Sequence, residues 1–340
     1  MAAFHERLIA LQIPGTGAFA RAPAPLEARW NRTMQQSVSA PPDNRLLPRV
    51  RLWLSTTDVV VPAILVAWFV LVIVPIIILF VYSFFTTVQF RTVYTLSLDT
   101  WIGLFESGRW EVTLRTLRIA VTVTLIELVV GFPFAFWLAK GGVGKGGRAI
   151  CLAMLTIPFF LDMSSRTIVW RAILGQSGLI NTILMGTGLT DTPVEWLLYS
   201  EVAVHFGMVV SLFPPMVLPI FLAINLIDDS LIEASKDLGA SPGQTLKRII
   251  LPLSLPGIMA GVVFCLGPAL AAWVEPGMLG GGFVNLISNS IESAYSALRY
   301  PVVAALSAFV ILLLMLLLGL MYLVARRFGD PASSFRVLRG

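Results

Sequence analysis

Charged side chains are scarce in this chain. Only 13% of its 340 residues are Asp, Glu, Lys or Arg, whereas 57% are hydrophobic. Soluble domains usually carry about 25% charged residues. The deficit argues against a soluble globular protein and indicates that lipid is the solvent for most of the chain.

Cysteine and histidine are also rare, with two of each. Cys151 and Cys265 lie in apolar stretches without a C-x-x-C spacing, and His5 and His205 are too far apart to form a spaced metal motif. The sequence therefore indicates no metal site, no disulfide framework and no redox chemistry. A membrane-embedded enzyme would need clustered His, Cys or carboxylate side chains at the membrane face, and the sequence offers no such cluster.

A phosphate-binding loop is missing as well. No G-x-x-x-x-G-K-[ST] sequence occurs anywhere in the chain. The glycine-rich segment 141–147 includes Lys145, but it lacks the strand–loop–helix context and a Ser or Thr after the lysine. We interpret it as a flexible loop, and we expect no cofactor in this chain.

What the sequence does contain is long apolar runs. A bilayer core about 30 Å thick needs about 20 apolar residues in a helix, and prolines inside such runs are tolerated because neighbouring helices satisfy the freed carbonyls. The prediction is an all-α integral membrane protein with six transmembrane helices. The six predicted spans are Val59–Phe84, Ile119–Leu138, Ile150–Trp170, Val202–Leu226, Ile258–Val274 and Val302–Val324.

The basic residues are concentrated on one predicted side of the membrane. Of 24 Lys and Arg residues, 17 lie in residues 1–57, after the second span, after the fourth span or in the C-terminal tail. Cytoplasmic loops attract Lys and Arg, so both termini are predicted to be cytoplasmic. The net charge of +5 then reflects topology, and nucleic acid is not an expected partner.

Three segments follow from this pattern. Residues 1–57 are rich in Pro, Arg and Ala and are predicted to be a mostly disordered cytoplasmic tail. Residues 58–328 form the six-helix membrane domain, and residues 329–340 form a second cytoplasmic tail.

A polar segment, residues 228–252, interrupts the apolar pattern between the fourth and fifth spans. Asp229 or Ser230 can cap a first short helix, and Gly239 occupies a position typical of a helix end. Ser241 can cap a second helix with Pro242 in its first turn. We expect a helix–turn–helix elbow along the cytoplasmic membrane face.

The spacing within this elbow is specific. It reads Glu233-Ala234-Ser235, three residues, Gly239, nine residues, Ile249, one residue, Leu251-Pro252. This resembles the EAA loop of binding-protein-dependent ABC importer permeases, with Ser235 in place of the second Ala. The resemblance implies a MetI-like fold and a loop that docks onto a separate ATPase subunit. The residues it assigns to this coupling are Glu233, Ala234, Ser235, Asp237, Gly239, Ala240, Ile249, Leu251 and Pro252.

The resemblance also implies partners and a setting. A second permease subunit, homologous or identical, would complete the pathway, and two cytoplasmic ATPase subunits would hold ATP and magnesium. A periplasmic substrate-binding protein would deliver the solute in a bacterial inner membrane. Segments such as 157–170, 213–220 and 276–281 are similar to the spermidine/putrescine permease branch, which implies a polyamine-like solute. Related permeases move opines, phosphonates, thiamine or iron, so the substrate stays open.

Ionisable side chains within the predicted spans are candidates for the substrate pathway. A charge at mid-bilayer costs roughly 2.5 to 3.5 kcal/mol on insertion scales, so such residues usually face a partner or an aqueous path. Carboxylates would favour a cation, and tryptophans would offer aromatic faces for it. The candidates are Glu127, Asp162, Arg166, Trp170, Trp273 and Glu275.

Alternatives to the pathway role remain at this point. Asp162 and Arg166, four residues apart, are equally expected to pair with each other, and Glu127 can instead be protonated or hydrogen-bonded to a neighbouring helix. A protein of another class, a stand-alone secondary transporter or channel, would use these carboxylates as ion sites and would not need the docking loop.

Overall fold

The computed structural model describes residues 47–88, 91–106 and 109–328. The chain divides into two units, Met1–Val72 and Ile73–Gly340, and each is considered by itself. Helix α3 (Leu47–Tyr82) begins in the first unit and ends in the second. Residues 47–57 of the predicted tail therefore belong to a helix, whereas residues 1–46 and the predicted tail 329–340 lie outside the described residues.

Six helical segments in the described part of the chain are long and apolar enough to cross a membrane, which confirms the predicted number. Their bounds are Val60–Tyr82, Trp110–Lys140, Met163–Gly186, Glu195–Asn225, Pro242–Ala271 and Tyr300–Arg327. The predicted first, second, fourth and sixth spans overlap these segments closely.

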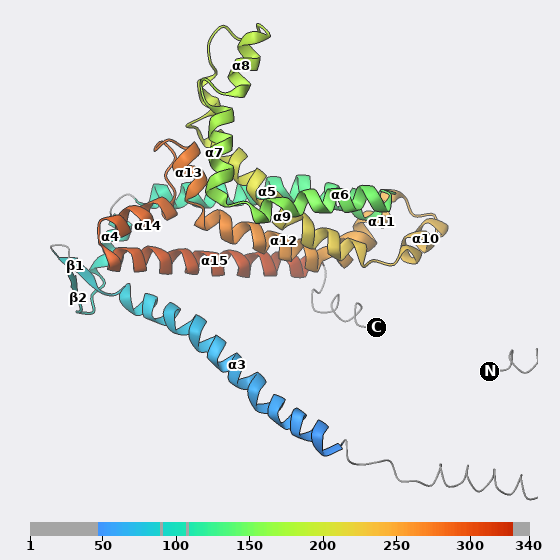
Figure 1. Cartoon of the computed structure of the whole chain (residues 1–340), viewed down its shortest axis with the longest axis horizontal. Helices are drawn as coiled ribbons and strands as arrows, with labels where there is room; N and C mark the ends of the chain where they lie inside the picture. Colours follow the sequence, from blue (N-terminus) through green and yellow to red (C-terminus); the bar gives the residue numbers. More distant parts are fainter. Residues whose placement is uncertain (1–46, 89–90, 107–108, 329–340) are drawn as a thin grey trace, which may run out of the picture. The chain divides into compact units, whose positions relative to one another are not determined.

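Four long helices of the second unit run side by side (Figure 1). Helix α9 (Glu201–Asn225) packs against both α5 (Arg109–Lys140) and α12 (Leu251–Ala271), and α12 packs against α15 (Tyr300–Phe328). Their shared core is aliphatic, because lipid-facing positions leave only the inner stripe for packing. Its fully buried large side chains include Ile119, Met208, Met216, Ile220, Ile224 and Leu270.

Close approach of α9 and α12 depends on two glycines of α12. A Cβ at Gly257 would lie 2.4 Å from the Ala223 Cβ and 2.6 Å from the Pro219 carbonyl oxygen, and one at Gly261 would lie 2.9 Å from the Met216 carbonyl oxygen. Small residues four apart let helix backbones meet in membranes, where dispersion contacts replace the hydrophobic effect. The pair α9 and α12 is therefore tightly packed.

The predicted third span, Ile150–Trp170, is wrong in its bounds. The chain forms α6 (Lys145–Thr156), a 3-10 turn η1 (Ile157–Phe160) and then α7 (Met163–Leu174) and α8 (Leu179–Gly186). Leu161 is extended, and Asp162 caps α7 by accepting hydrogen bonds from the backbone N–H groups of Ser164 and Ser165. A proline in the 3-10 turn and an Asp that accepts hydrogen bonds from nearby backbone N–H groups break the helix where an apolar run predicted continuity.

The fifth span begins earlier than predicted. Its helical segment runs Pro242–Ala271, because the second arm of the elbow continues without interruption into the span. The segment comprises α11 (Pro242–Thr245), a π-helical turn η3 (Leu246–Ile250) and α12.

Shorter elements complete the second unit at the ends of these helices. Near the end of α3, an antiparallel hairpin pairs Thr87 with Thr92. The remaining elements are β1 (Thr86–Val88), β2 (Arg91–Val93), α4 (Asp99–Glu106), η2 (Glu195–Leu197), α10 (Asp229–Asp237), α13 (Val274–Leu279) and α14 (Ile287–Ser296).

Candidate functional site

The elbow between α9 and α12 forms as two capped helices. The cap of α10 is Asp228, whose carboxylate accepts a hydrogen bond of 2.9 Å from the Ser230 N–H, so the predicted cap at Asp229 or Ser230 is displaced by one or two residues. At α11, Ser241 and Gln244 form a reciprocal capping box, which confirms Ser241 as the cap. Both caps satisfy N–H groups that a helix start leaves unpaired.

The turn between the two arms is made by Gly239. Its φ of +79° lies in the left-handed region, as predicted. The Gly239 N–H donates to the Lys236 carbonyl at 2.8 Å, and the Ala240 N–H donates to the Ser235 carbonyl at 3.0 Å. These bonds close the end of α10 and fix the angle at which α11 departs.

Ser235 braces the two arms from inside. It is 7% exposed, and its Oγ lies 2.7 Å from the Oγ1 of Thr245, which is also buried. Ser235 is the position where the sequence departs from the EAA pattern. Its hydroxyl gives α10 a polar contact with α11 that an alanine cannot make, so this member of the predicted coupling set faces the interior.

The outward face of α10 is apolar and acidic. Leu231 and Leu238 are 45% and 88% exposed, and Ala234 lies between them on the same helical face. Glu233 and Asp237 are exposed beside this stripe. Of the predicted coupling residues, Glu233, Ala234, Asp237 and Gly239 are thus accessible to a partner. Leu238, which the motif spacing did not single out, is the most exposed.

The other predicted coupling residues anchor the elbow to the membrane helices. Ala240, Ile249, Leu251 and Pro252 are each half-buried. The last three lie at the junction of η3 and α12, so they join the elbow to the fifth span.

Two basic residues, Lys140 and Arg148, hold the elbow in place. Lys140, the last residue of α5, donates to the Ile227 carbonyl at 2.6 Å and to the Asp229 carboxylate at 2.5 Å. The Lys140 side chain is 12% exposed, so its ammonium group is sheltered. Arg148 of α6 donates to the Ala139 carbonyl at 2.9 Å and to Asn225 Oδ1 at 3.3 Å. The loop after α5 is thus fastened to the start of α10 and the end of α9.

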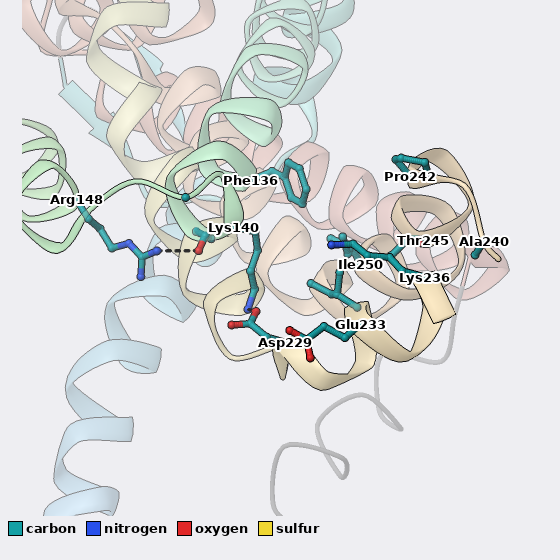
Figure 2. A pocket seen from close by; sticks show the side chains of 13 residues that line it. Phe136, Lys140, Arg148, Asp229, Glu233, Lys236, Ala240, Pro242, Thr245 and Ile250 are labelled. Carbon is teal, nitrogen blue, oxygen red and sulfur yellow. Dashed lines mark hydrogen bonds and ion pairs between the residues drawn. The ribbon is translucent and has the colours of Figure 1, made fainter. Parts of the chain in front are cut away.

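A cleft of about 570 Å³ lies between this fastening and the elbow (Figure 2). Lys140 and Asp229 meet in it, with Glu233 beside them, and Phe136 forms an apolar wall. Helix α10 therefore rests on α5 through a few polar contacts, with open space behind it.

Acid should loosen the start of α10. Hydrogen bonds from the backbone and side chain of Ser230, aided by the charge of Lys140, lower the pKa of Asp228, while partial desolvation opposes them. A depressed carboxyl pKa contributes stability above the unfolded-state pKa, and this stability is lost as pH falls through the folded-state pKa.

The predicted pathway residues lie in three separate places. Glu127 is fully buried in α5, and neither of its carboxylate oxygens has a hydrogen-bond partner among the described residues. In α12, the buried Cys265 Sγ donates to the Leu212 carbonyl at 3.3 Å. Burying an unpaired carboxylate costs several kcal/mol. The presence of Glu127 at this position is therefore not explained by its contribution to packing.

Glu275 lies in α13, beyond the end of α12, and is 1% exposed. Burial raises the pKa of its carboxyl, opposed by hydrogen bonds from its own backbone N–H and from Ser211 and by the charge of Arg166. Gly207 of α9 lets α13 approach closely, because a Cβ there would lie 2.4 Å from the Leu279 Cδ1, and it would also touch the Glu275 Cγ at 3.5 Å. Glu275 therefore faces α9, away from solvent.

The Arg166 side chain forms no ion pair with Asp162 in the described part of the chain. The expected Asp162–Arg166 pair is wrong, because the Asp162 carboxylate is used as the cap of α7. Trp170 packs edge-on against Phe206 at 4.7 Å between ring centroids, whereas Trp273 is half exposed on another side of the bundle. These six residues do not converge on one pocket.

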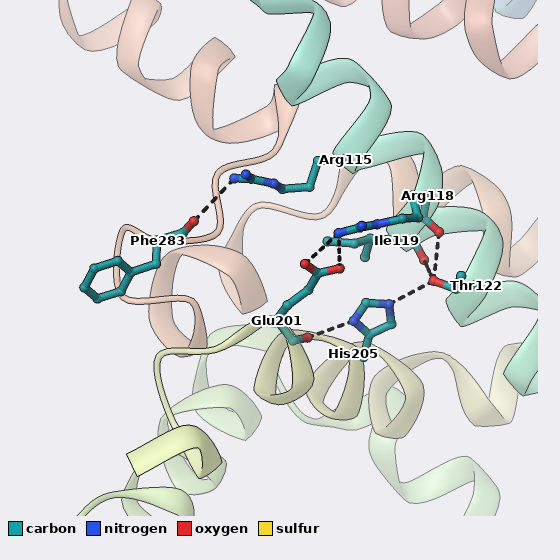
Figure 3. A network of polar contacts seen from close by, with 7 residues as sticks. All are labelled: Arg115, Arg118, Ile119, Thr122, Glu201, His205 and Phe283. Atoms are coloured by element: carbon teal, nitrogen blue, oxygen red, sulfur yellow. Dashed lines mark hydrogen bonds and ion pairs between the residues drawn. The ribbon is translucent and has the colours of Figure 1, made fainter.

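A second polar network joins α5 and α9 at the ends remote from the elbow (Figure 3). Arg118 donates to both carboxylate oxygens of Glu201 at 2.6 and 2.7 Å, and Thr122 Oγ1 lies 2.8 Å from His205 Nε2. Arg115 donates to the Phe283 carbonyl at 3.3 Å, which adds the loop after α13. The two helices are thus fixed at both ends. Across the described residues, no group of three or more His, Cys, Asp or Glu side chains is placed to hold a metal ion.

Known proteins with these features are membrane permeases. Residues 120–330 match the family model described as "Binding-protein-dependent transport system inner membrane component". The chain is 36% identical over 229 residues to the spermidine/putrescine transport system permease protein PotB of Escherichia coli (strain K12), covering 67% of this chain and 81% of that protein. It is 34% identical over 230 residues to PotB of Haemophilus influenzae (strain ATCC 51907 / DSM 11121 / KW20 / Rd), covering 67% and 79%.

Solved structures support the fold. A chain of the bacterial alginate ABC transporter, in complex with an alginate pentasaccharide-bound periplasmic protein, aligns with a TM-score of 0.64 at 21% identity, covering 84% of this chain and 98% of that one. A second structure of an alginate importer gives a TM-score of 0.61 at 21% identity, covering 82% and 99%. The chain belongs to the family of inner-membrane permease components of binding-protein-dependent ABC importers, whose ATPase is a separate subunit.

Proposed function

We propose that this chain, paired with a second homologous or identical permease, imports a polyamine-like cation. The sequence similarity to two PotB proteins, whose names state spermidine/putrescine transport, supports this substrate class. Family membership favours an ATP-driven importer over the stand-alone secondary transporter considered from the sequence.

The elbow carries the mechanistic part of the proposal. Its exposed stripe of Leu231, Ala234 and Leu238, with Glu233 beside it, is suited to a cleft on a cytoplasmic ATPase subunit. Exposed apolar side chains on a short helix are typical anchors of such interfaces. Two ATPase subunits, one at each permease, would hold ATP and magnesium, and a periplasmic binding protein would deliver the solute at the opposite face.

Force applied at the elbow reaches the fifth span directly. The second arm and α12 form one helical segment, Pro242–Ala271, and α12 packs tightly on α9 through Gly257 and Gly261. A tilt of α10 and α11 therefore moves α12 and α9 together. This gives the alternating access that an importer needs, with two states biased by the ATPase.

We also propose that both termini are cytoplasmic. The fastening of Lys140 to Asp229 and of Arg148 to Asn225 brings two predicted cytoplasmic loops together at one end of the bundle. A shared basic surface at that end agrees with the positive-inside rule.

Uptake into sealed vesicles tests the proposal. Vesicles with the permease pair, the ATPase and the binding protein should take up spermidine when ATP is supplied to the ATPase side, and an ion gradient alone should give none. Uptake that follows the gradient and ignores ATP would overturn the importer mechanism.

The docking surface has its own test. Leu238→Asp should reduce co-purification of the ATPase by at least about thirtyfold, because interface anchors contribute about 2 kcal/mol or more. Leu189→Asp is the matched control, since Leu189 is 72% exposed in a connection far from the elbow along the chain. Equal loss in both variants would indicate general damage and not a docking role.

Glu127 is proposed to belong to the solute pathway. Glu127→Gln should slow uptake of a cationic solute while leaving assembly with the ATPase intact, because the change removes a charge inside the bundle but keeps its shape. Unchanged transport kinetics would remove Glu127 from the pathway.

A further inference from the structure

A groove of about 700 Å³ opens at the end of α12 remote from the elbow, between α12, α14 and α15. Part of its lining is apolar, supplied by Leu270, Val303, Val310 and Ile311. The lining residues of α15 run from Val303 to Ile311, which corresponds to about 12 Å along a helix. The groove is therefore long enough to hold an extended aliphatic chain.

One face of α14 supplies the mouth of this groove. Ser288, Ile291, Glu292, Tyr295 and Ser296 all line it. They follow the spacing i, i+3, i+4, i+7 and i+8, which places them on a single helical stripe. The chain just after α12 adds Trp273, which is 50% exposed, opposite Tyr295, which is 61% exposed.

Hydrogen bonds hold these walls together. The Ser288 hydroxyl donates to the Ala272 carbonyl, and the Asn289 Nδ2 donates to the Trp273 carbonyl at 3.1 Å. The Ile287 N–H donates to Thr116 Oγ1 of α5 at 3.0 Å. Helix α14 is thus tied to the backbone of the segment that carries Trp273, so the two walls of the groove are joined.

Glu292 is the one charged residue among the groove's described lining residues. It has no hydrogen bond or ion pair in the described part of the chain. A carboxylate that lines the same groove as two accessible aromatic rings and several apolar side chains has the chemistry that recognises an organic cation. An exposed carboxylate alone would carry no such conclusion, but here the rings and the groove accompany it.

We propose that this groove binds an aliphatic primary amine. The ammonium group pairs with Glu292 and lies against the rings of Trp273 and Tyr295, and the methylene chain packs in the apolar part. Only the direction in which the amine then travels rests on the proposed function. Glu275, although close to Trp273 in sequence, does not supply the carboxylate of this site, because it is buried against α9.

Equilibrium binding of radiolabelled spermidine tests this site. The sample is the assembled transporter without its binding protein, in lipid nanodiscs. Glu292→Gln should raise Kd by about threefold to tenfold, the range of an accessible ion pair combined with a cation–π contact. The effect should shrink in high salt. Trp273→Leu should weaken binding by a similar factor, whereas Trp273→Phe and Tyr295→Phe should keep most of it.

Two controls separate charge from folding. Glu292→Asp keeps a carboxylate and should retain most of the binding, and Glu195→Gln removes an exposed carboxylate that does not line the groove. Unlabelled putrescine should compete, and butane-1,4-diol, which has the same chain without charge, should not.

The possible outcomes test the amine site and the proposed import function separately. Unchanged spermidine binding in Glu292→Gln, or equal loss in Glu195→Gln, overturns the amine site even where ATP-driven uptake is normal. Binding that depends on Glu292 in a transporter that imports no spermidine supports the site and overturns the proposed substrate.

Discussion

The two ends of the fifth helical segment, Pro242–Ala271, are built in different ways. The elbow end is local, because its caps, its glycine turn and its brace come from residues 228–252. The opposite end is assembled from α12, the Trp273 position, α14 and α15, which together draw on residues 270–311. The proposed ATPase contact is therefore encoded in a short motif, whereas the proposed amine groove is assembled from several helices.

The connection between the two ends should be the most sensitive feature. Gly257→Ala should destabilise the protein by about 1 to 3 kcal/mol, since the added methyl would overlap Ala223 and the Pro219 carbonyl. Thermal unfolding in detergent and ATP-driven uptake would measure the effect at both levels.

Gly267→Ala is the matched control on the same helix, because a Cβ there meets nothing within 4 Å. It should be neutral or stabilise α12 by about 0.5 to 1 kcal/mol. Equal destabilisation by both substitutions would contradict the close α9–α12 packing.

The elbow end should weaken when its clamp is removed. Lys140→Met should destabilise the start of α10 by about 1 to 2 kcal/mol. The substitution removes the ammonium group, so the Ile227 carbonyl and the Asp229 carboxylate each lose a short hydrogen bond. Hydrogen exchange at residues 228–238 should rise, while Trp273 and α14 stay protected. Lys145→Met, an exposed lysine of the same loop, should change neither.

The opposite end should respond to pH. Because burial raises the pKa of Glu275, the fold holds its proton more tightly than the unfolded chain does, so its stability falls as pH rises above the unfolded carboxyl pKa. Glu275→Gln should remove this loss, so the difference in stability between the variant and the parent protein should favour the variant increasingly as pH rises. Thermal unfolding between pH 5 and 8.5 would show it. Glu195→Gln should leave the pH dependence unchanged.

The smallest effect is expected at the internal brace. Ser235→Ala restores the residue of the EAA pattern and should cost about 1 kcal/mol or less, because Thr245 keeps a hydrogen bond to the Ser241 carbonyl. ATPase co-purification should stay intact. A complete loss of docking would show that Ser235 contacts the partner and does not brace the elbow.

The sequence predicted the local features well. The number of spans, the capping role of Ser241 and the left-handed turn at Gly239 follow from apolar run length, side-chain chemistry and backbone sterics, which act over a few residues. The predicted bounds of the third span are wrong because the sequence suggests Asp162 as a charge within the bilayer. In the structure Asp162 follows the break in the helix and caps the start of α7.

The sequence did not predict which distant side chains meet. Nothing in the spacing of Lys140 indicates that it reaches Asp229, and nothing in α14 alone indicates that Glu292 shares a groove with Trp273. Glu127 and Glu275 both look like pathway carboxylates in sequence, yet one is enclosed by the bundle and the other faces α9. Such relations depend on helix rotation, which hydropathy does not specify.

The π-helical turn at Leu246–Ile250 gives the elbow a further mechanical property. A π turn holds one residue more than an α turn, and such turns occur often at functional sites. Passing that residue along the helix would rotate the elbow by about 100° about the axis of α12 and advance it by about 1.5 Å. In the proposed mechanism, a push from the ATPase on the elbow would be converted into a rotation of the fifth helical segment. This rotation would change the direction that the Trp273 segment faces at the proposed amine groove.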